Sequence, residues 1–184
     1  MKRIIVCVLA GAGFAHAGEG TPRLALDLLT GGDPAGAAIE YRRLALAADA
    51  PAEQAGWYWA SAYAYGQAGA WPEAERMLDR VEDRDPALGD VASWLRGEAS
   101  WARRDYRASA FFFESMRRST SRDPGVSRWA GRRLAAAQVQ QGDPASARTA
   151  LDPADQTGAA AVEEFAAGRD RRPGVGGWLG LVPG

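Results

Sequence analysis

Four segments of this chain share one pattern, in which a short polar turn is followed by an alanine-rich stretch. They begin at residues 32, 69, 104 and 142, with the sequences GDPAGAAIEY, GAWPEAERML, RDYRASAFFF and GDPASARTAL. The spacings are therefore 37, 35 and 38 residues. Such a period, with two helices in each unit, is typical of helical solenoids, so the repeat predicts an all-α fold built from stacked antiparallel helix pairs.

Asp-Pro dipeptides indicate where these helices begin. They stand at Asp33-Pro34, Asp85-Pro86, Asp123-Pro124, Asp143-Pro144 and Asp152-Pro153. An aspartate carboxylate accepts hydrogen bonds from the free N–H groups of a first turn, and proline fits the first helical position, which needs no donor. Between the dipeptides, apolar residues recur at spacings of three and four, and no stretch alternates like a strand. We therefore expect about seven to nine short helices.

The second of the four units resembles the tetratricopeptide repeat, a two-helix motif of about 34 residues. The family pattern has a large, a small and an aromatic residue in the first helix, an alanine and a large apolar residue in the second, and a proline at the close. The matching residues are Tyr58, Ala62, Tyr65, Gly69 at the turn, Ala74, Leu78 and Pro86. The resemblance implies a superhelical repeat domain over residues 22–153.

The other three units retain only part of this pattern. Their matching residues are Ala25, Leu28, Ala37 and Tyr41 in the first, Gly97, Tyr106, Phe113 and Met116 in the third, and Ala135, Ala147 and Leu151 in the fourth. Terminal repeats have one neighbour to pack against, so a weaker pattern is expected at the ends. The resemblance implies that the repeats are packed together by Tyr58, Ala62, Tyr65, Ala74, Leu78, Gly97 and Phe113.

Three adjacent aromatic residues, Trp57, Tyr58 and Trp59, indicate a binding surface as well as a core. Consecutive side chains on a helix point about 100° apart, so three neighbours are not expected to face one core. The family register implies a concave groove lined by Trp59, Tyr63, Trp94, Glu98, Trp101, Trp129 and Arg132. Tryptophan and tyrosine rings are rigid anchors in binding sites. The alternative is that these rings are buried between repeats, as large aromatics at helical spacing often are.

The first 17 residues have the pattern of a secretory signal peptide. Lys2 and Arg3 precede an apolar stretch over residues 4–14, and Ala15-His16-Ala17 offers a small-x-small cleavage site. The alternative is a membrane anchor, but eleven apolar residues fall short of the roughly 20 that span a bilayer. We therefore expect an exported protein of the periplasm or cell envelope.

Export leaves a chain with little catalytic or metal-binding chemistry. Cys7 and His16, the single cysteine and histidine, lie in the signal peptide, and the remaining 20 basic and 23 acidic residues give a net charge of −3. We expect no metal, no cofactor, no nucleic-acid partner and no enzymatic activity. The catalytic alternative is a carboxylate pair among Glu98, Glu114, Glu163 and Glu164, as in glycoside hydrolysis. The arginine pairs at 117–118 and 132–133 leave an anionic ligand as an alternative to a solvated surface.

The C-terminal part has two expected segments. Residues 154–172 contain a helix over 158–167 and a basic stretch with Arg169, Arg171 and Arg172, and residues 173–184 form an apolar tail rich in glycine and proline. The tail resembles the start of a Pro/Gly-bounded membrane hairpin found after repeat domains in some bacterial envelope proteins. One expectation is membrane contact through Trp178 and the three arginines, and the other is an unstructured terminal tail.

These features predict a non-catalytic interaction scaffold of the bacterial cell envelope, which binds a peptide or a partner protein in its groove. The alternative is a structural, membrane-associated component of an envelope complex, anchored through its C-terminal tail. The exposure of Trp59, Trp94 and Trp101 distinguishes the two hypotheses. Exposed rings favour groove binding, whereas buried rings favour contacts on the outside of the array.

Overall fold

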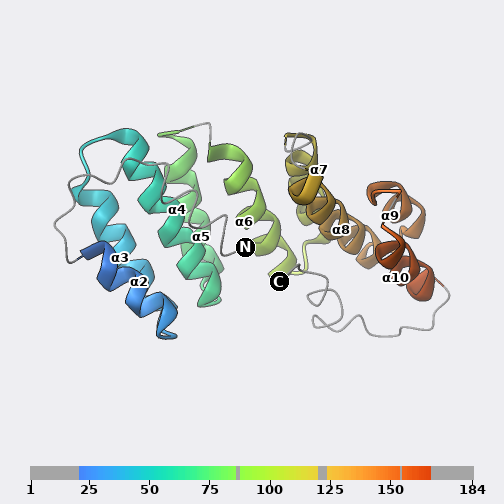
Figure 1. Cartoon of the computed structure of the whole chain (residues 1–184), viewed down its shortest axis with the longest axis horizontal. Helices are drawn as coiled ribbons and strands as arrows, with labels where there is room; N and C mark the ends of the chain where they lie inside the picture. Colours follow the sequence, from blue (N-terminus) through green and yellow to red (C-terminus); the bar gives the residue numbers. More distant parts are fainter. Residues whose placement is uncertain (1–20, 86–87, 120–123, 154, 167–184) are drawn as a thin grey trace. The chain divides into compact units, whose positions relative to one another are not determined.

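The computed structural model describes residues 21–85, 88–119, 124–153 and 155–166 (Figure 1). The helices in these ranges are α2 (Thr21–Thr30), α3 (Pro34–Ala47), α4 (Pro51–Gln67), α5 (Trp71–Glu82), α6 (Gly89–Ala102), α7 (Tyr106–Ser119), α8 (Pro124–Gln140), α9 (Pro144–Ala150) and α10 (Gln156–Ala166). The same ranges contain no strand, so the predicted all-α class is confirmed. The predicted signal peptide and the apolar tail, with Arg169, Arg171, Arg172 and Trp178, lie outside the described residues.

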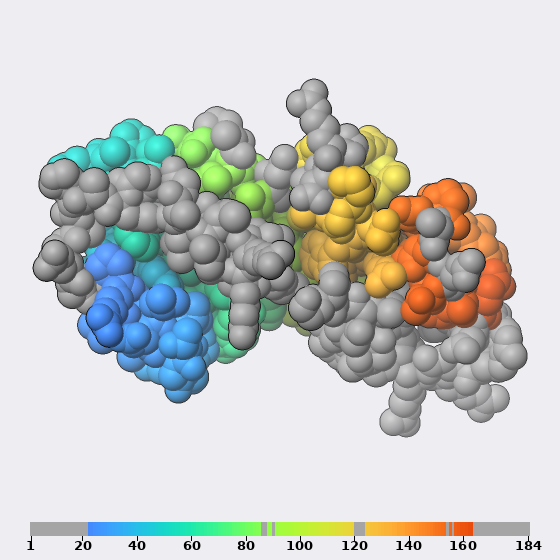
Figure 2. Space-filling model, viewed as in Figure 1, coloured from blue at the N-terminus to red at the C-terminus, as the bar shows by residue number. Residues whose placement is uncertain are grey.

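The chain divides into two compact units, one up to Ala99 and one from Ser100, so the division falls within α6. In the first unit, α3 packs against α2 and α4, and α4 also packs against α5 (Figure 1). In the second unit, α8 packs against α7 and α9, and α10 packs against α8 and α9. Figure 2 shows the orange atoms of α9 and α10 in contact. The helices of each unit therefore pack mainly against their neighbours in sequence.

One turn geometry recurs at the start of all four repeated segments. Its central residues are Gly32, Gly69, Arg104 and Gly142, with φ angles of 88°, 74°, 62° and 79°. In every copy the central N–H donates to the carbonyl three residues earlier, at 2.9 to 3.4 Å, and the next N–H donates to the carbonyl five residues earlier, at 2.9 to 3.0 Å. These two bonds define the Schellman ending of a helix. The sequence repeat is therefore also a repeat of backbone structure.

An aspartate caps the helix that follows this turn in three of the four copies. Asp33, Asp105 and Asp143 each accept a hydrogen bond from the N–H three residues ahead, at 2.8, 3.0 and 2.9 Å. In the remaining copy, Ala70 precedes α5 and offers no side-chain cap, but Pro72 lies in the first turn. The turn and the cap together end one helix and start the next within a few residues.

The Asp-Pro prediction holds at three dipeptides and is wrong at one. Helices α3, α8 and α9 begin at Pro34, Pro124 and Pro144, as expected. No helix begins at Asp152-Pro153, because α10 starts at Gln156 and the N–H of Gly158 donates to Asp155 at 3.0 Å. Pro86 lies outside the described residues.

Arg104 is the one non-glycine residue with a positive φ in the described ranges. A left-handed conformation costs a residue with a Cβ roughly 1–2 kcal/mol, whereas glycine adopts it freely. Glycine also raises the entropy of the unfolded chain, which offsets part of this gain. We therefore expect Arg104→Gly to raise the free energy of unfolding by about 0.5–1 kcal/mol. Urea unfolding followed by circular dichroism measures this change. Arg103→Gly, at a position without a positive φ, is the control and should destabilise the protein; a loss of stability in both variants would contradict the prediction.

The residues expected to pack the repeats lie mostly in the interior. Tyr58, Ala62, Ala74, Leu78 and Phe113 are at most 3% exposed, Gly97 is buried, and Tyr65 is half-buried. Ser61 is also fully buried, and its hydroxyl donates to the carbonyl of Ala38 at 2.8 Å, which joins α4 to α3. The small side chains of Ser61, Ala62 and Ala74 allow neighbouring helices to approach closely.

Candidate partner-binding site

A cluster of three rings joins α4 to α6. Tyr63 lies one helical turn after Trp59 on α4, and the centroids of the two rings are 5.9 Å apart with their planes at 16°. Trp94 of α6 lies 6.2 Å from Trp59 and 5.9 Å from Tyr63, measured between ring centroids. Trp59 is completely buried and Trp94 is 5% exposed, whereas Tyr63 is half-buried. We refer to these three residues as the Tyr63 cluster.

Tyr63 is the member of this cluster that reaches the surface. Trp59 stacks on its ring and Trp94 packs against it at a tilt of 40°, so the two buried indoles restrict its movement. Burial raises the pKa of the Tyr63 phenol above its usual 10.0, so the hydroxyl remains a hydrogen-bond donor at neutral pH. Glu98 is half-buried and follows Trp94 by one helical turn, on the same face of α6. The first unit therefore offers a ring held by its neighbours and its hydroxyl group.

The three adjacent aromatics of α4 are all buried, contrary to the expectation that one of them would face a ligand. Trp57 stacks on Tyr41 of α3, with ring centroids 6.0 Å apart. The guanidinium of Arg84 lies 5.0 Å from the centre of the Tyr58 ring, and Trp59 contacts α6. Trp57 and Tyr58 are each 3% exposed. Because α4 has neighbours on several sides, rings that point about 100° apart each meet a different partner.

The predicted groove residues of the second unit contact aromatic and charged neighbours. Trp101 lies edge-on to Tyr106, with centroids 5.2 Å apart. The guanidinium of Arg133 lies 4.8 Å from the ring of Trp101 and 5.2 Å from that of Phe113. Trp129 packs edge-on against Phe113 at 5.7 Å. Trp101 and Trp129 are half-buried, so each exposes part of its indole.

Arg132, the predicted basic residue of the groove, forms an ion pair that joins α8 to the start of α10. Its Nη2 donates to Oδ1 of Asp155 at 2.7 Å, and its Nε donates to Oδ2 at 2.5 Å. The Asp155 side chain is 1% exposed and also accepts the N–H of Gly158. The hydrogen bonds from Arg132 lower the pKa of Asp155, and the same contact raises the pKa of Arg132. Arg132 therefore holds the C-terminal helix in place.

The seven predicted groove residues divide between the two units. The first unit contains Trp59, Tyr63, Trp94 and Glu98, and the second contains Trp101, Trp129 and Arg132. The structure brings the rings of Trp59, Tyr63 and Trp94 into one cluster. Of these three, the burial of Trp59 and Trp94 leaves Tyr63 as the ring that a partner can contact without repacking of the helices.

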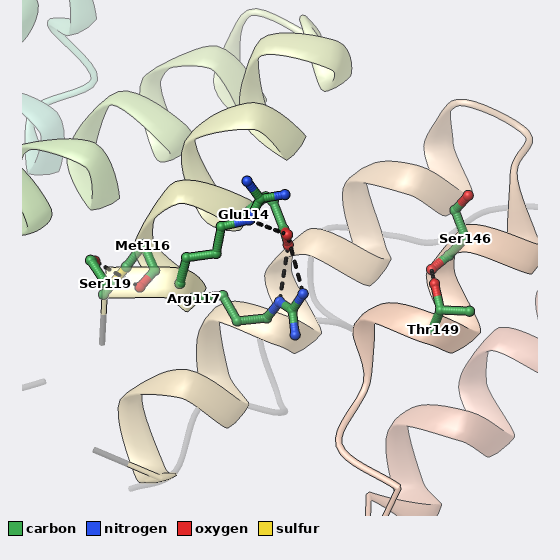
Figure 3. Close-up of polar contacts among 7 residues, drawn as sticks. Glu114, Met116, Arg117, Ser119, Ser146 and Thr149 are labelled. Carbon is green, nitrogen blue, oxygen red and sulfur yellow. Dashed lines mark hydrogen bonds and ion pairs between the residues drawn. The ribbon is translucent and has the colours of Figure 1, made fainter. Parts of the chain in front are cut away.

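Two of the acidic residues considered for catalysis are held in ion pairs. Glu114 accepts hydrogen bonds from Nε of Arg117 at 3.0 Å (Figure 3) and from Nε of Arg118 at 2.8 Å. The hydrogen bond from Arg117 is the main cause that lowers the pKa of Glu114. Exposed Glu163 pairs with Arg148, which lowers its pKa. A catalytic acid of the glycosidase type needs a raised pKa to remain protonated at neutral pH. The lowered pKa values of Glu114 and Glu163 favour the ionised form of both carboxyl groups instead. The side chain of Glu164 lies outside the described residues.

Within the part of the chain that the structure describes, no group of His, Cys, Asp or Glu residues is arranged to hold a metal ion. No described helix is both long enough and apolar enough to cross a membrane.

No protein-family model, curated protein or solved structure matches this chain. Its function is therefore inferred from its own residues and their contacts.

Proposed function

We propose that the chain is a non-catalytic protein-interaction scaffold, in which helix pairs form a superhelical array similar to tetratricopeptide repeats. The support for an array is the recurrence of one Schellman turn at residues 32, 69, 104 and 142, and the packing of α2 to α5 and of α7 to α10 mainly against their neighbours in sequence. Arrays of this kind present extended surfaces that bind peptides or other proteins. The signal-peptide pattern of residues 1–17 supports a location in the cell envelope.

We propose further that the partner contacts Tyr63. The observation that carries this proposal is the half-buried Tyr63 ring, which stacks on the buried indole of Trp59 and packs at a tilt of 40° against that of Trp94. A ring already held by its neighbours loses little conformational entropy when a partner covers it, so more of the contact energy appears as affinity. Tyrosine also combines apolar area with a hydroxyl group, which is why it is frequent among the residues that dominate protein interfaces.

Binding by a Tyr63→Ala variant tests this site. Truncation of a dominant interface residue costs at least about 2 kcal/mol, so we expect the affinity for the partner to fall about 30-fold. The partner is first captured from envelope extract with the full chain and is then titrated against each variant. Tyr65→Ala, which removes another half-buried tyrosine from the same helix, is the matched control and should bind almost as the unchanged protein does. Equal affinity in the two variants, with circular dichroism unchanged, would contradict the site.

A second function, as a structural component that contacts its neighbours through its outer surface, is favoured by the burial of Trp59 and Trp94 and by two exposed apolar side chains of α3. Ile39 and Leu46 are 60% and 65% exposed, and a spacing of seven residues places them on one face of the helix. The double variant Ile39→Asp/Leu46→Asp should then fail to enter the complex in size-exclusion chromatography of envelope extract, while Tyr63→Ala enters it. The opposite pattern supports the Tyr63 site. The tail proposed to anchor such a component lies outside the described residues.

A further inference from the structure

A cavity of about 440 Å³ lies in the second unit, where the ends of α7 and α9 meet the start of α8. The residues that line it include Arg117, Ser127, Arg128, Ala150, Leu151 and Asp152. Its volume falls in the range of small-ligand sites. None of these residues belongs to the Tyr63 cluster, so the cavity is a separate surface feature.

A close approach of two helices fixes one wall of this cavity. A Cβ atom at Gly131 of α8 would lie 2.7 Å from the carbonyl oxygen of Ala150, so only glycine permits the observed contact between α8 and the end of α9. Leu151, the next residue, is 8% exposed and anchors the chain after α9 in the interior. The wall therefore keeps its position through backbone contact and apolar packing.

The two arginines that line the cavity keep unused hydrogen-bond donors. Arg117 donates through Nε and Nη2 to Glu114, at 3.0 and 3.2 Å, and Figure 3 shows its third nitrogen pointing away from Glu114. Arg128 donates through Nε to Asp152 at 3.4 Å, and neither of its terminal nitrogens donates to a described residue. The two side chains are 36% and 48% exposed, so their free donors are accessible.

We propose that this cavity binds a carboxylate group of a peptide, with Arg117 and Arg128 donating to its oxygens. Guanidinium groups match the planar geometry of a carboxylate and form charge-assisted hydrogen bonds with it. Asp152 also lines the cavity, beside Arg128, so its charge disfavours a multiply charged anion such as phosphate more than a single carboxylate. Ala150 and Leu151 supply apolar area for the carbon atoms next to the carboxylate.

The test is an NMR titration of the full chain at low salt with three short peptides. The first has a central glutamate, an acetylated N-terminus and an amidated C-terminus, and the second is the same peptide with glutamine in place of the glutamate. The third has no acidic side chain but a free C-terminal carboxylate. We expect saturable shifts of the Arg117 and Arg128 Nε–Hε signals with the first or the third peptide and none with the second. The peptide that binds identifies an acidic side chain or a chain terminus as the source of the carboxylate.

Substitutions separate this site from charge effects and from the Tyr63 site. We expect Arg117→Gln and Arg128→Gln each to weaken peptide binding about tenfold or more, because each removes a charge-assisted hydrogen bond. Arg118→Gln is the matched control, because Arg118 pairs with the same Glu114 at 2.8 Å but does not line the cavity. Tyr63→Ala should also leave peptide binding to the cavity unchanged. The proposal for the cavity and the proposal for the Tyr63 site can therefore fail independently of each other. No binding of any carboxylate peptide, or equal affinity in Arg128→Gln and Arg118→Gln, overturns the inference.

Discussion

Replacing Trp59 with alanine is expected to lower the free energy of unfolding by about 3–5 kcal/mol, the typical cost of truncating a buried tryptophan. The ring is completely buried and packs against both Tyr63 of its own helix and Trp94 of α6. Its removal leaves a cavity between two helices and takes away the support of the Tyr63 ring. The free energy of unfolding of native proteins is typically about 5–15 kcal/mol, so the loss is a large part of the total.

Two further variants show whether the effect comes from packing of the indole. Nε1 of Trp59 is buried and has no hydrogen-bond partner among the described residues, so Trp59→Phe keeps a ring and removes an unsatisfied N–H. We expect Trp59→Phe to lower the free energy of unfolding clearly less than Trp59→Ala does. Phe111→Ala, at a ring that is 69% exposed, should change stability by no more than about 0.5 kcal/mol. Urea unfolding measures all three variants, and similar values for Trp59→Ala and Phe111→Ala would contradict the buried position of Trp59.

Replacing Asp155 with alanine is expected to lower the free energy of unfolding by about 3 kcal/mol. The variant leaves Arg132 without its bidentate partner and Gly158 without its cap, both at the junction of α8 and α10. We expect the lower end of the range for buried pairs, because the Arg132 side chain is 22% exposed. Glu163→Ala is the matched control, since it breaks an ion pair with Arg148 whose side chains are 44% and 56% exposed, and exposed pairs contribute little. Equal effects of the two substitutions in urea unfolding would contradict a structural role for the Arg132 and Asp155 pair.

The same pair predicts a dependence of stability on pH. Hydrogen bonds from Arg132 lower the pKa of Asp155 in the folded protein below the value of about 3.9 that an aspartate has when unfolded. The stabilisation is therefore complete above about pH 4 and is lost as the pH falls through the lower, folded pKa. The stability difference between the unchanged protein and Asp155→Ala should then decrease at acidic pH. A difference that is the same at neutral pH and below the pKa of folded Asp155 would contradict an ionic role for this carboxylate.

The local structure follows closely from the sequence because turns and caps depend on a few neighbouring residues. The repeated segments at 32, 69 and 142 carry glycine where the Schellman turn needs a positive φ. Arg104 stands at the equivalent position of the third segment, although arginine rarely adopts that conformation. Asp33 and Asp143 cap the helices that follow, as their Asp-Pro dipeptides predict, and Asp105 caps α7 without a following proline.

The candidate site was harder to predict because it depends on which helices surround each residue. A periodicity argument treats a helix as having one buried face, but α4 contacts α3, α5 and α6, so Trp57, Tyr58 and Trp59 are all buried. The partner of Arg132 lies 23 residues further along the chain, and no local pattern relates the two residues. The available signal is Asp155 itself, because aspartate is a favoured N-cap residue and stands directly before α10.

The most direct test of the proposed scaffold function is photo-crosslinking from position 63. A photoreactive phenylalanine analogue replaces Tyr63 in the full chain, and in a second protein it replaces Tyr65 on the same helix. After illumination of intact cells, we expect one or a few defined crosslinked proteins from position 63 and much weaker crosslinks from position 65. Absence of crosslinks from position 63, or the same crosslinked proteins at equal yield from both positions, would contradict a partner-binding surface at Tyr63.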